Sequence, residues 1–134
     1  MSAPFTPGAV GHFGLAVRDP KAHAAWFRRC LLFEPYMETD DAVAVGNDAT
    51  TIWFWEGEPS PETIGHISFQ LRDRAELERA LAHLKRENVE LEDPGDEIGP
   101  MAPGSEYVGI WFHDPDGYRW ELSTKDANPS RGSG

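Results

Sequence analysis

Cysteine is almost absent from the 134-residue chain: Cys30 is the single one, so no disulfide can form within it. A lone cysteine is typical of a reducing compartment, and we expect the protein to be cytoplasmic. Apolar runs are short, and none approaches the roughly 20 residues that cross a bilayer as a helix. The opening MSAPFTPGAV has neither a basic nor an apolar region, so we expect no export signal there.

Positive charge is also scarce. The chain has 12 Lys and Arg against 23 Asp and Glu, a formal net charge of −11, and no Lys or Arg lies between Arg29 and Arg72. Phosphates would be repelled rather than neutralised, which excludes nucleic acid and an anionic membrane surface as partners. The balance favours a neutral or cationic small molecule, with a solvated acidic face as the plainer alternative.

What the chain does contain is a repeat. Residues 11–19 read GHFGLAVRD and residues 65–73 read GHISFQLRD, so His12 and His66 are 54 positions apart. A helical stretch follows each copy, and each half later reaches a turn, at 47–49 and 114–117. The second half carries 14 more residues, because 116 − 48 = 68 and 68 − 54 = 14. We assign the surplus to the Glu92–Gly104 loop.

Alternation within the strands places both histidines on one kind of face. Phe13, Leu15 and Val17 share a face opposite His12, and Ile67, Phe69 and Leu71 share one opposite His66. We expect the apolar faces to lie under the helices, with stripes of Ala22, Ala25, Trp26 and Leu32 in the first and Leu77, Ala80, Leu81 and Leu84 in the second. Cys30 is expected to pack in the interior, and His23 and His83 to lie on the surface.

The last strand adds a carboxylate to the histidine side. Tyr118, Trp120 and Leu122 fall on one face, which leaves Glu121 on the other with Arg119. Two imidazoles and a carboxylate on one concave face predict a divalent metal site with open positions, formed by His12, His66 and Glu121. The plainer alternative is a pair of hydrogen-bonded strand histidines and a solvated glutamate.

The same alignment makes Trp53 of the first half the equivalent of Glu121 in the second, because Asp48 corresponds to Asp116. Trp53 and Trp55 would then share the cavity face. They predict either an aromatic wall for a planar or cationic ligand or a surface for dimer or core packing.

These features resemble the vicinal oxygen chelate superfamily, also called the glyoxalase/bleomycin-resistance/dioxygenase superfamily. The resemblance covers roughly residues 9–125 and rests on GHFGLAVRD, GHISFQLRD, the helix after each, and FHDPDGYRWEL. It implies an α+β fold in one domain, 1–134, built of two paired βαβββ modules at about 9–58 and 63–125. Their strands would curl around a central cavity. The resemblance also implies a homodimer.

In metal-using members of this family the ion is held at the first strand of each module and at the closing strands. Carried over, those positions are again His12, His66 and Glu121. The ligand types suit Fe, Mn, Co, Ni or Zn without choosing among them. Trp53 stands where glyoxalase I enzymes have an acidic ligand, and Trp111 where extradiol dioxygenases have a tyrosine, so both activities are disfavoured.

Two functions stay open on the sequence. The first is a divalent-metal-dependent enzyme that acts on a small oxygen-chelating substrate, of the lyase, isomerase or transferase type. The alternative is a metal-free drug- or metabolite-binding protein of the bleomycin-resistance type.

The remaining candidates surround the predicted metal. Glu106 and His113 are candidates for the catalytic acid or base. Residues 92–104 are a candidate lid, with a plain surface loop as the competing view. The predicted substrate-binding residues are Trp53, Trp55, Ser68, Gln70, Trp111 and Arg119.

Overall fold

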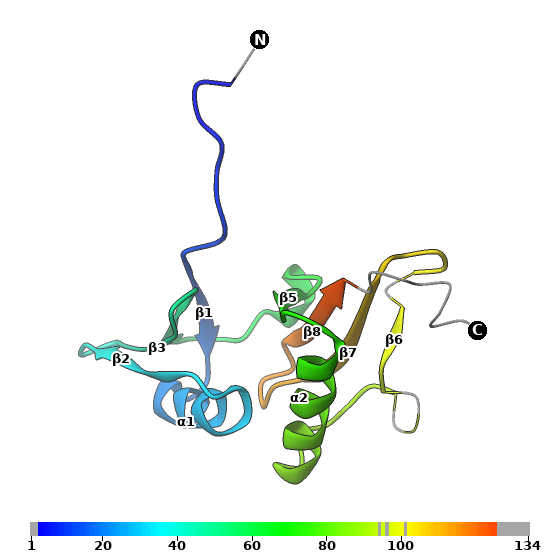
Figure 1. Cartoon of the computed structure of the whole chain (residues 1–134). Helices are drawn as coiled ribbons and strands as arrows, with labels where there is room; N and C mark the ends of the chain where they lie inside the picture. Colours follow the sequence, from blue (N-terminus) through cyan, green and yellow to red (C-terminus); the bar gives the residue numbers. More distant parts are fainter. Residues whose placement is uncertain (1–2, 94, 96, 101, 126–134) are drawn as a thin grey trace. The chain divides into compact units, whose positions relative to one another are not determined.

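The computed structural model describes residues 3–93, 95, 97–100 and 102–125. The chain divides into two compact units, residues 1–59 and 60–134. Each unit contains one four-stranded mixed sheet and one α-helix (Figure 1). The α+β class that the family resemblance implies is confirmed. None of the described helices is long and apolar enough to span a membrane.

The first unit has the strand order β1-β4-β3-β2, in which β1 and β4 are parallel and the other pairs antiparallel. Helix α1 packs against β3 and β4. The elements are β1 (His12–Val17), α1 (Pro20–Leu31), β2 (Glu34–Glu38), β3 (Ala42–Gly46) and β4 (Thr51–Glu56).

The second unit repeats this arrangement with the strand order β5-β8-β7-β6, again with one parallel pair, β5 and β8. Helix α2 packs against β8 and β7. The elements are a 3-10 turn η1 (Pro61–Thr63), β5 (Ile67–Gln70), α2 (Arg74–Arg86), β6 (Gly99–Pro100), β7 (Tyr107–His113) and β8 (Arg119–Lys125).

The register of the two sheets shows which residues are equivalent. Gly14 of β1 pairs with Trp53 of β4, and Ser68 of β5 pairs with Glu121 of β8. Gly14 and Ser68 are 54 positions apart, the same offset as the two histidines. Trp53 is therefore the structural counterpart of Glu121, as the turn alignment predicts.

The Arg-Asp that ends each repeat starts a helix. The side chain of Asp19 accepts a hydrogen bond from Ala22 N at 3.1 Å, and that of Asp73 accepts one from Glu76 N at 2.8 Å. Each aspartate is an N-cap that satisfies a backbone donor left over at the first turn. The recurrence of Asp therefore has a structural cause that is separate from the histidines.

Helix α1 buries a different face from the predicted one. Its buried residues are His23, Ala24, Phe27 and Cys30, whereas Ala22, Ala25 and Leu32 are exposed. The reason is Phe27, whose ring lies 5.1 Å from that of Phe54 and thereby fixes the inward face. His23, predicted on the surface, is 3% exposed, with its ring 5.0 Å from that of Phe54. Cys30 is buried as expected.

Helix α2 follows the prediction more closely. Leu77 and Leu84 are buried and Ala80 and Leu81 are half-buried, while Ile110, Phe112 and Trp120 supply the facing strands. The helix ends at Arg86, and Asn88, two residues further on, has a left-handed φ of 59°. The rings of Phe69 and Trp120 stack at 5.5 Å, so the parallel pair is also joined on its helix side.

The surplus loop at 92–104 is not free of strand structure. Gly99 and Pro100 form β6 against Gly109 and Val108, and Leu91 makes an isolated bridge to Phe112 just before the loop. This edge pairing corrects the prediction of a simple insertion, because alternation cannot reveal a two-residue strand. Pro94, Asp96 and Met101 lie outside the described residues.

The turn between β7 and β8 is organised by a buried aspartate. Asp114 Oδ1 accepts hydrogen bonds from Asp116 N at 3.0 Å and Tyr118 N at 3.1 Å. Its Oδ2 accepts one from the indole Nε1 of Trp120 at 2.9 Å. Gly117 has a φ of 91°, a conformation that favours glycine, which explains its place in Asp-Pro-Asp-Gly.

Candidate metal and ligand site

Glu121 is the most unusual side chain of the second unit. It lies in the middle of β8 and is 0% exposed. Neither carboxylate oxygen has a hydrogen-bond partner among the described residues. Burial raises the pKa of Glu121 above its ordinary value, and the neighbouring Ser68, His66 and Arg119 oppose this rise. A buried carboxylate without partners is costly, which makes it a candidate ligand for a cation.

His66 supplies a second donor beside this carboxylate. Its Nε2 lies 3.9 Å from Glu121 Oε1. The imidazole also packs edge-on against Trp111 at 4.7 Å and 73°. Metal–ligand bonds of about 2.0–2.2 Å to each atom let one ion contact two donors up to about 4 Å apart. His66 and Glu121 therefore fit a shared divalent ion.

No group of three His, Cys, Asp or Glu side chains close enough to hold a metal occurs among the residues described. The third predicted ligand, His12, is the first residue of β1, where it is exposed and pairs with Thr51. It belongs to the first unit, whereas His66 and Glu121 belong to the second. The three-residue site thus stays a prediction.

Arg119 also lies against the ring of Trp111. Its Cζ is 4.1 Å from the centroid of Trp111, within the range of a cation–π contact. Glu92 binds the guanidinium through two hydrogen bonds, of 2.5 and 2.8 Å. This ion pair lowers the pKa of Glu92 and raises that of Arg119. The positive charge on this face is therefore already balanced.

His113 shares the same carboxylate. Its Nε2 lies 3.4 Å from Glu92 Oε2, and its side chain is partly exposed. Sequence reasoning did not single out Glu92, because it lies where strand and helix periodicity give no signal. Its place is set by pairing to β7, since Glu92 N donates to Trp111 O and His113 N donates to Glu90 O. An imidazole held by a carboxylate is a suitable proton donor or acceptor.

The other predicted site residues of this unit differ in their contacts and their exposure. The hydroxyls of Ser68 and Ser123 are hydrogen-bonded at 2.9 Å, and Ser68 is paired with Glu121 across the sheet. Gln70 ends β5 and is exposed.

Glu106 is an exposed residue whose carboxylate lies 3.3 Å from Lys125 Nζ. Because this carboxylate is exposed and paired with a lysine, Glu106 is the weaker candidate for the base.

In the first unit, the strand face opposite α1 is aromatic. Trp53 and Tyr36 make an edge-to-face contact at 6.3 Å, and Ile52 and Phe54 are buried on the helix side. Trp55 is 45% exposed and Tyr36 is 59% exposed. Trp53 and Trp55 therefore lie opposite the helix-packed face, with no carboxylate at the position that corresponds to Glu121.

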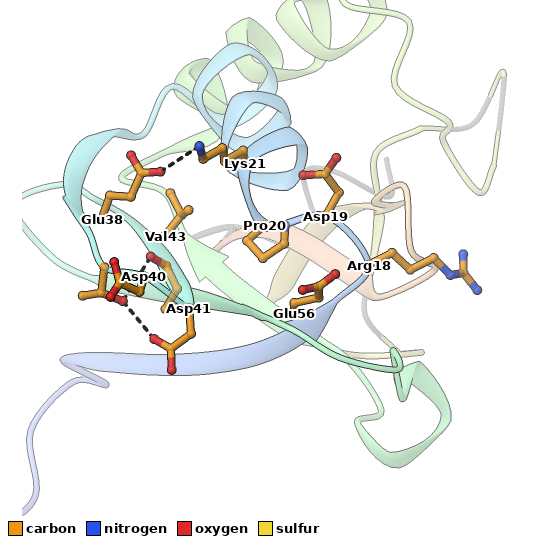
Figure 2. A pocket seen from close by; sticks show the side chains of 11 residues that line it. Arg18, Asp19, Pro20, Lys21, Glu38, Asp40, Asp41, Val43 and Glu56 are labelled. Carbon is orange, nitrogen blue, oxygen red and sulfur yellow. Dashed lines mark hydrogen bonds and ion pairs between the residues drawn. The ribbon is translucent and has the colours of Figure 1, made fainter.

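A hollow of the first unit lies elsewhere, beside the start of α1 and the β2–β3 turn (Figure 2). Lys21 Nζ and Glu38 Oε1 are paired at 3.4 Å, and Thr39 donates to Asp41. Its lining is mostly charged and contains none of the predicted site residues; the acidic members are Asp19, Glu38, Asp40, Asp41 and Glu56.

The fold and the face together define a class: a protein of repeated βαβββ units with a histidine and a buried glutamate on the strand face. The chain matches the family model of the Glyoxalase/Bleomycin resistance protein/Dioxygenase superfamily over residues 9–122. It therefore belongs to this superfamily, as the resemblance indicates.

Solved structures with this fold include proteins of different function. The fosfomycin resistance protein FosX of Listeria monocytogenes is 21% identical, with a TM-score of 0.72 over 92% of this chain and 98% of that one. A lactoylglutathione lyase of Agrobacterium tumefaciens is 15% identical, with a TM-score of 0.66 over 89% and 95%. A superfamily protein of Alicyclobacillus acidocaldarius is 12% identical, with a TM-score of 0.71 over 92% and 96%.

No curated protein matches the chain. At these identities the structural likeness shows the fold and leaves the reaction to be argued from the residues.

Proposed function

We propose that the protein is a divalent-metal-dependent enzyme that acts on a small substrate with two neighbouring oxygens. The observation that carries the proposal is Glu121, a fully buried carboxylate that has no hydrogen-bond partner in the described part of the chain and whose Oε1 lies 3.9 Å from His66 Nε2. A protein gains nothing in stability from such a group, so its presence is best explained by a ligand that it binds.

His66 and Glu121 would hold the ion, and His12 would join them as the residue equivalent to His66 in the repeat. A bound divalent ion supplies Lewis-acid stabilisation of negative charge on a substrate oxygen. Three protein ligands leave positions for substrate, as catalytic sites require. Trp53, the counterpart of Glu121, offers no fourth ligand.

His113 is the residue of this chain best suited to move a proton. Glu92 Oε2 lies 3.4 Å from its Nε2 and can orient the imidazole. His113 and Trp111 are two positions apart in β7, so their side chains project from the same side of the strand. Arg119 also lies on this face, but its charge is balanced by Glu92, which favours a neutral substrate over a strongly anionic one.

The proposal is tested by the metal content of the purified protein and by titration with Mn²⁺, Fe²⁺, Ni²⁺ and Zn²⁺. Near-stoichiometric binding that is lost in His66→Ala and Glu121→Gln is the expected result. His83→Ala, on α2, is the matched histidine control and should bind as the wild type does. A wild-type protein that stays metal-free with every ion would contradict the proposal.

A second candidate is a ligand-binding protein that needs no metal, and the exposed aromatic face of the first unit favours it. Trp55 and Tyr36 are large, exposed and set in an acidic stretch, a combination that suits a cationic aromatic ligand. Quenching of tryptophan fluorescence by such a ligand, lost in Trp55→Ala and kept in His12→Ala, would favour this function. For the enzyme, His12→Ala should instead reduce metal binding.

A further inference from the structure

Gly109 lies in the middle of β7, next to the carboxylate of Glu121. It pairs with Ser123 of β8 on one side and with Gly99 of β6 on the other. A Cβ added to Gly109 would lie 3.1 Å from both Cγ and Cδ of Glu121, and closer still to Oε2. The carboxylate therefore occupies the space that any side chain at position 109 would need.

The backbone gives no other reason for glycine at this position. The glycines with left-handed φ among the described residues are Gly95, Gly104 and Gly117, and Gly109 is not one of them. Glycine inside a strand weakens it, because it adds chain entropy and packs no side chain. A buried mid-strand glycine that costs stability and meets no conformational demand indicates close approach of another group.

The group that approaches is the terminal part of a flexible side chain, not a backbone. A methyl group at position 109 would therefore be accommodated by moving the Glu121 carboxylate, with the strands left in register. The carboxylate has little room to retreat, since Glu121 is 0% exposed and Trp111 is paired with it across the two strands. The displacement would change its distance to His66.

We propose that Gly109 is a positioning residue whose bare α-carbon holds open the place of the Glu121 carboxylate beside His66. The steric part of this inference stands on the contacts alone, and its consequence for metal binding rests on the proposed function. Gly99 offers a matched control: it is the direct pairing partner of Gly109, and a Cβ there would meet nothing within 4 Å.

The steric part is tested without metal by a double-mutant cycle in stability. Gly109→Ala should lower the urea midpoint of the wild type. In a Glu121→Ala background it should leave the midpoint unchanged or raise it, because the obstructing carboxylate is gone. Gly99→Ala should behave alike in both backgrounds. An equal loss for Gly109→Ala with and without Glu121 would overturn the inference, as would failure of the Gly109→Ala/Glu121→Ala double variant to fold.

The functional part is tested by Mn²⁺ titration of the same variants. Gly109→Ala should bind Mn²⁺ at least about tenfold more weakly, the scale of disturbing a group that orients a ligand, and Gly99→Ala should bind as the wild type does. Unchanged affinity in Gly109→Ala would overturn the positioning role while the proposed metal function stands. A wild type that binds no Mn²⁺ would instead contradict the metal function for this ion, and the stability cycle would still decide the steric claim.

Discussion

At the scale of single residues, two acids among those the structure describes are buried, Asp114 and Glu121, and their surroundings differ. Asp114 accepts three hydrogen bonds within its own turn, two from backbone N–H groups and one from Trp120. Glu121, seven residues later, accepts none from the described residues. A satisfied buried carboxylate supports the fold, whereas an unsatisfied one costs stability and is retained for another purpose. Opposite mutational effects follow.

Glu121→Gln should stabilise the metal-free protein at pH 7, by about 1–3 kcal/mol, because it removes a buried charge that no described residue hydrogen-bonds. The folded-state pKa of Glu121 is raised, so the folded protein binds the proton more tightly than the unfolded chain. The wild type therefore loses stability as pH rises above about 4.3, the ordinary glutamate value, and the advantage of Gln disappears below it. Urea unfolding of both proteins between pH 4 and 8 measures this difference; a less stable Gln variant at pH 7 would contradict it.

Asp114→Asn should destabilise the protein by about 2–3 kcal/mol, since a hydrogen bond to a charged group is lost. Asn keeps an oxygen for the two backbone donors but turns an N–H₂ group toward the indole N–H of Trp120. The matched control is Asp48→Asn in the corresponding turn of the first unit, where the aspartate is exposed. Thermal unfolding of the two variants gives the comparison, and equal midpoints would show that the indole bond contributes little.

At the scale of elements, the nine-residue repeat serves two purposes at its two ends. Its histidine begins the strand region on the face opposite the helix, and its aspartate begins the helix as an N-cap. The cap needs only an acceptor near the first free N–H groups, so Asp recurs for reasons of helix stability. The histidine has no such local role.

Asp19→Ala and Asp73→Ala should each cost about 1 kcal/mol of unfolding free energy, and Asn at either position should restore most of it. Unfolding followed by circular dichroism at 222 nm measures the loss. Metal affinity should be unaffected, which separates this end of the repeat from the His end. A large loss of metal binding in Asp73→Ala would argue that the cap also orients the preceding strand.

At the scale of the whole molecule, acidity sets the response to salt. The net charge of −11 on 134 residues implies self-repulsion in the folded state, which ions screen. Raising NaCl from about 50 to about 500 mM should therefore raise the unfolding midpoint by a few degrees. Glu56→Gln/Glu58→Gln/Glu62→Gln, three exposed acids from the stretch without cations, should reduce this rise. A midpoint that falls with salt would show that ion pairs outweigh the repulsion.

The sequence by itself determined the repeat, the equivalence of Trp53 with Glu121 and the strand face on which each lies, because strand period and turn chemistry are local properties. The α+β class followed from the resemblance to the superfamily. The prediction of the buried face of α1 was wrong. Alanines lie on several sides of this helix, so the pattern did not single out one face, and the contact of Phe27 with Phe54 determines which face is buried. Only the tertiary structure decided that Glu92 joins Arg119 to His113, that Glu121 has no hydrogen-bond partner among the described residues and that Gly109 makes room for it. Those are contacts between separate strands and a loop, and their distances depend on packing that no local pattern encodes.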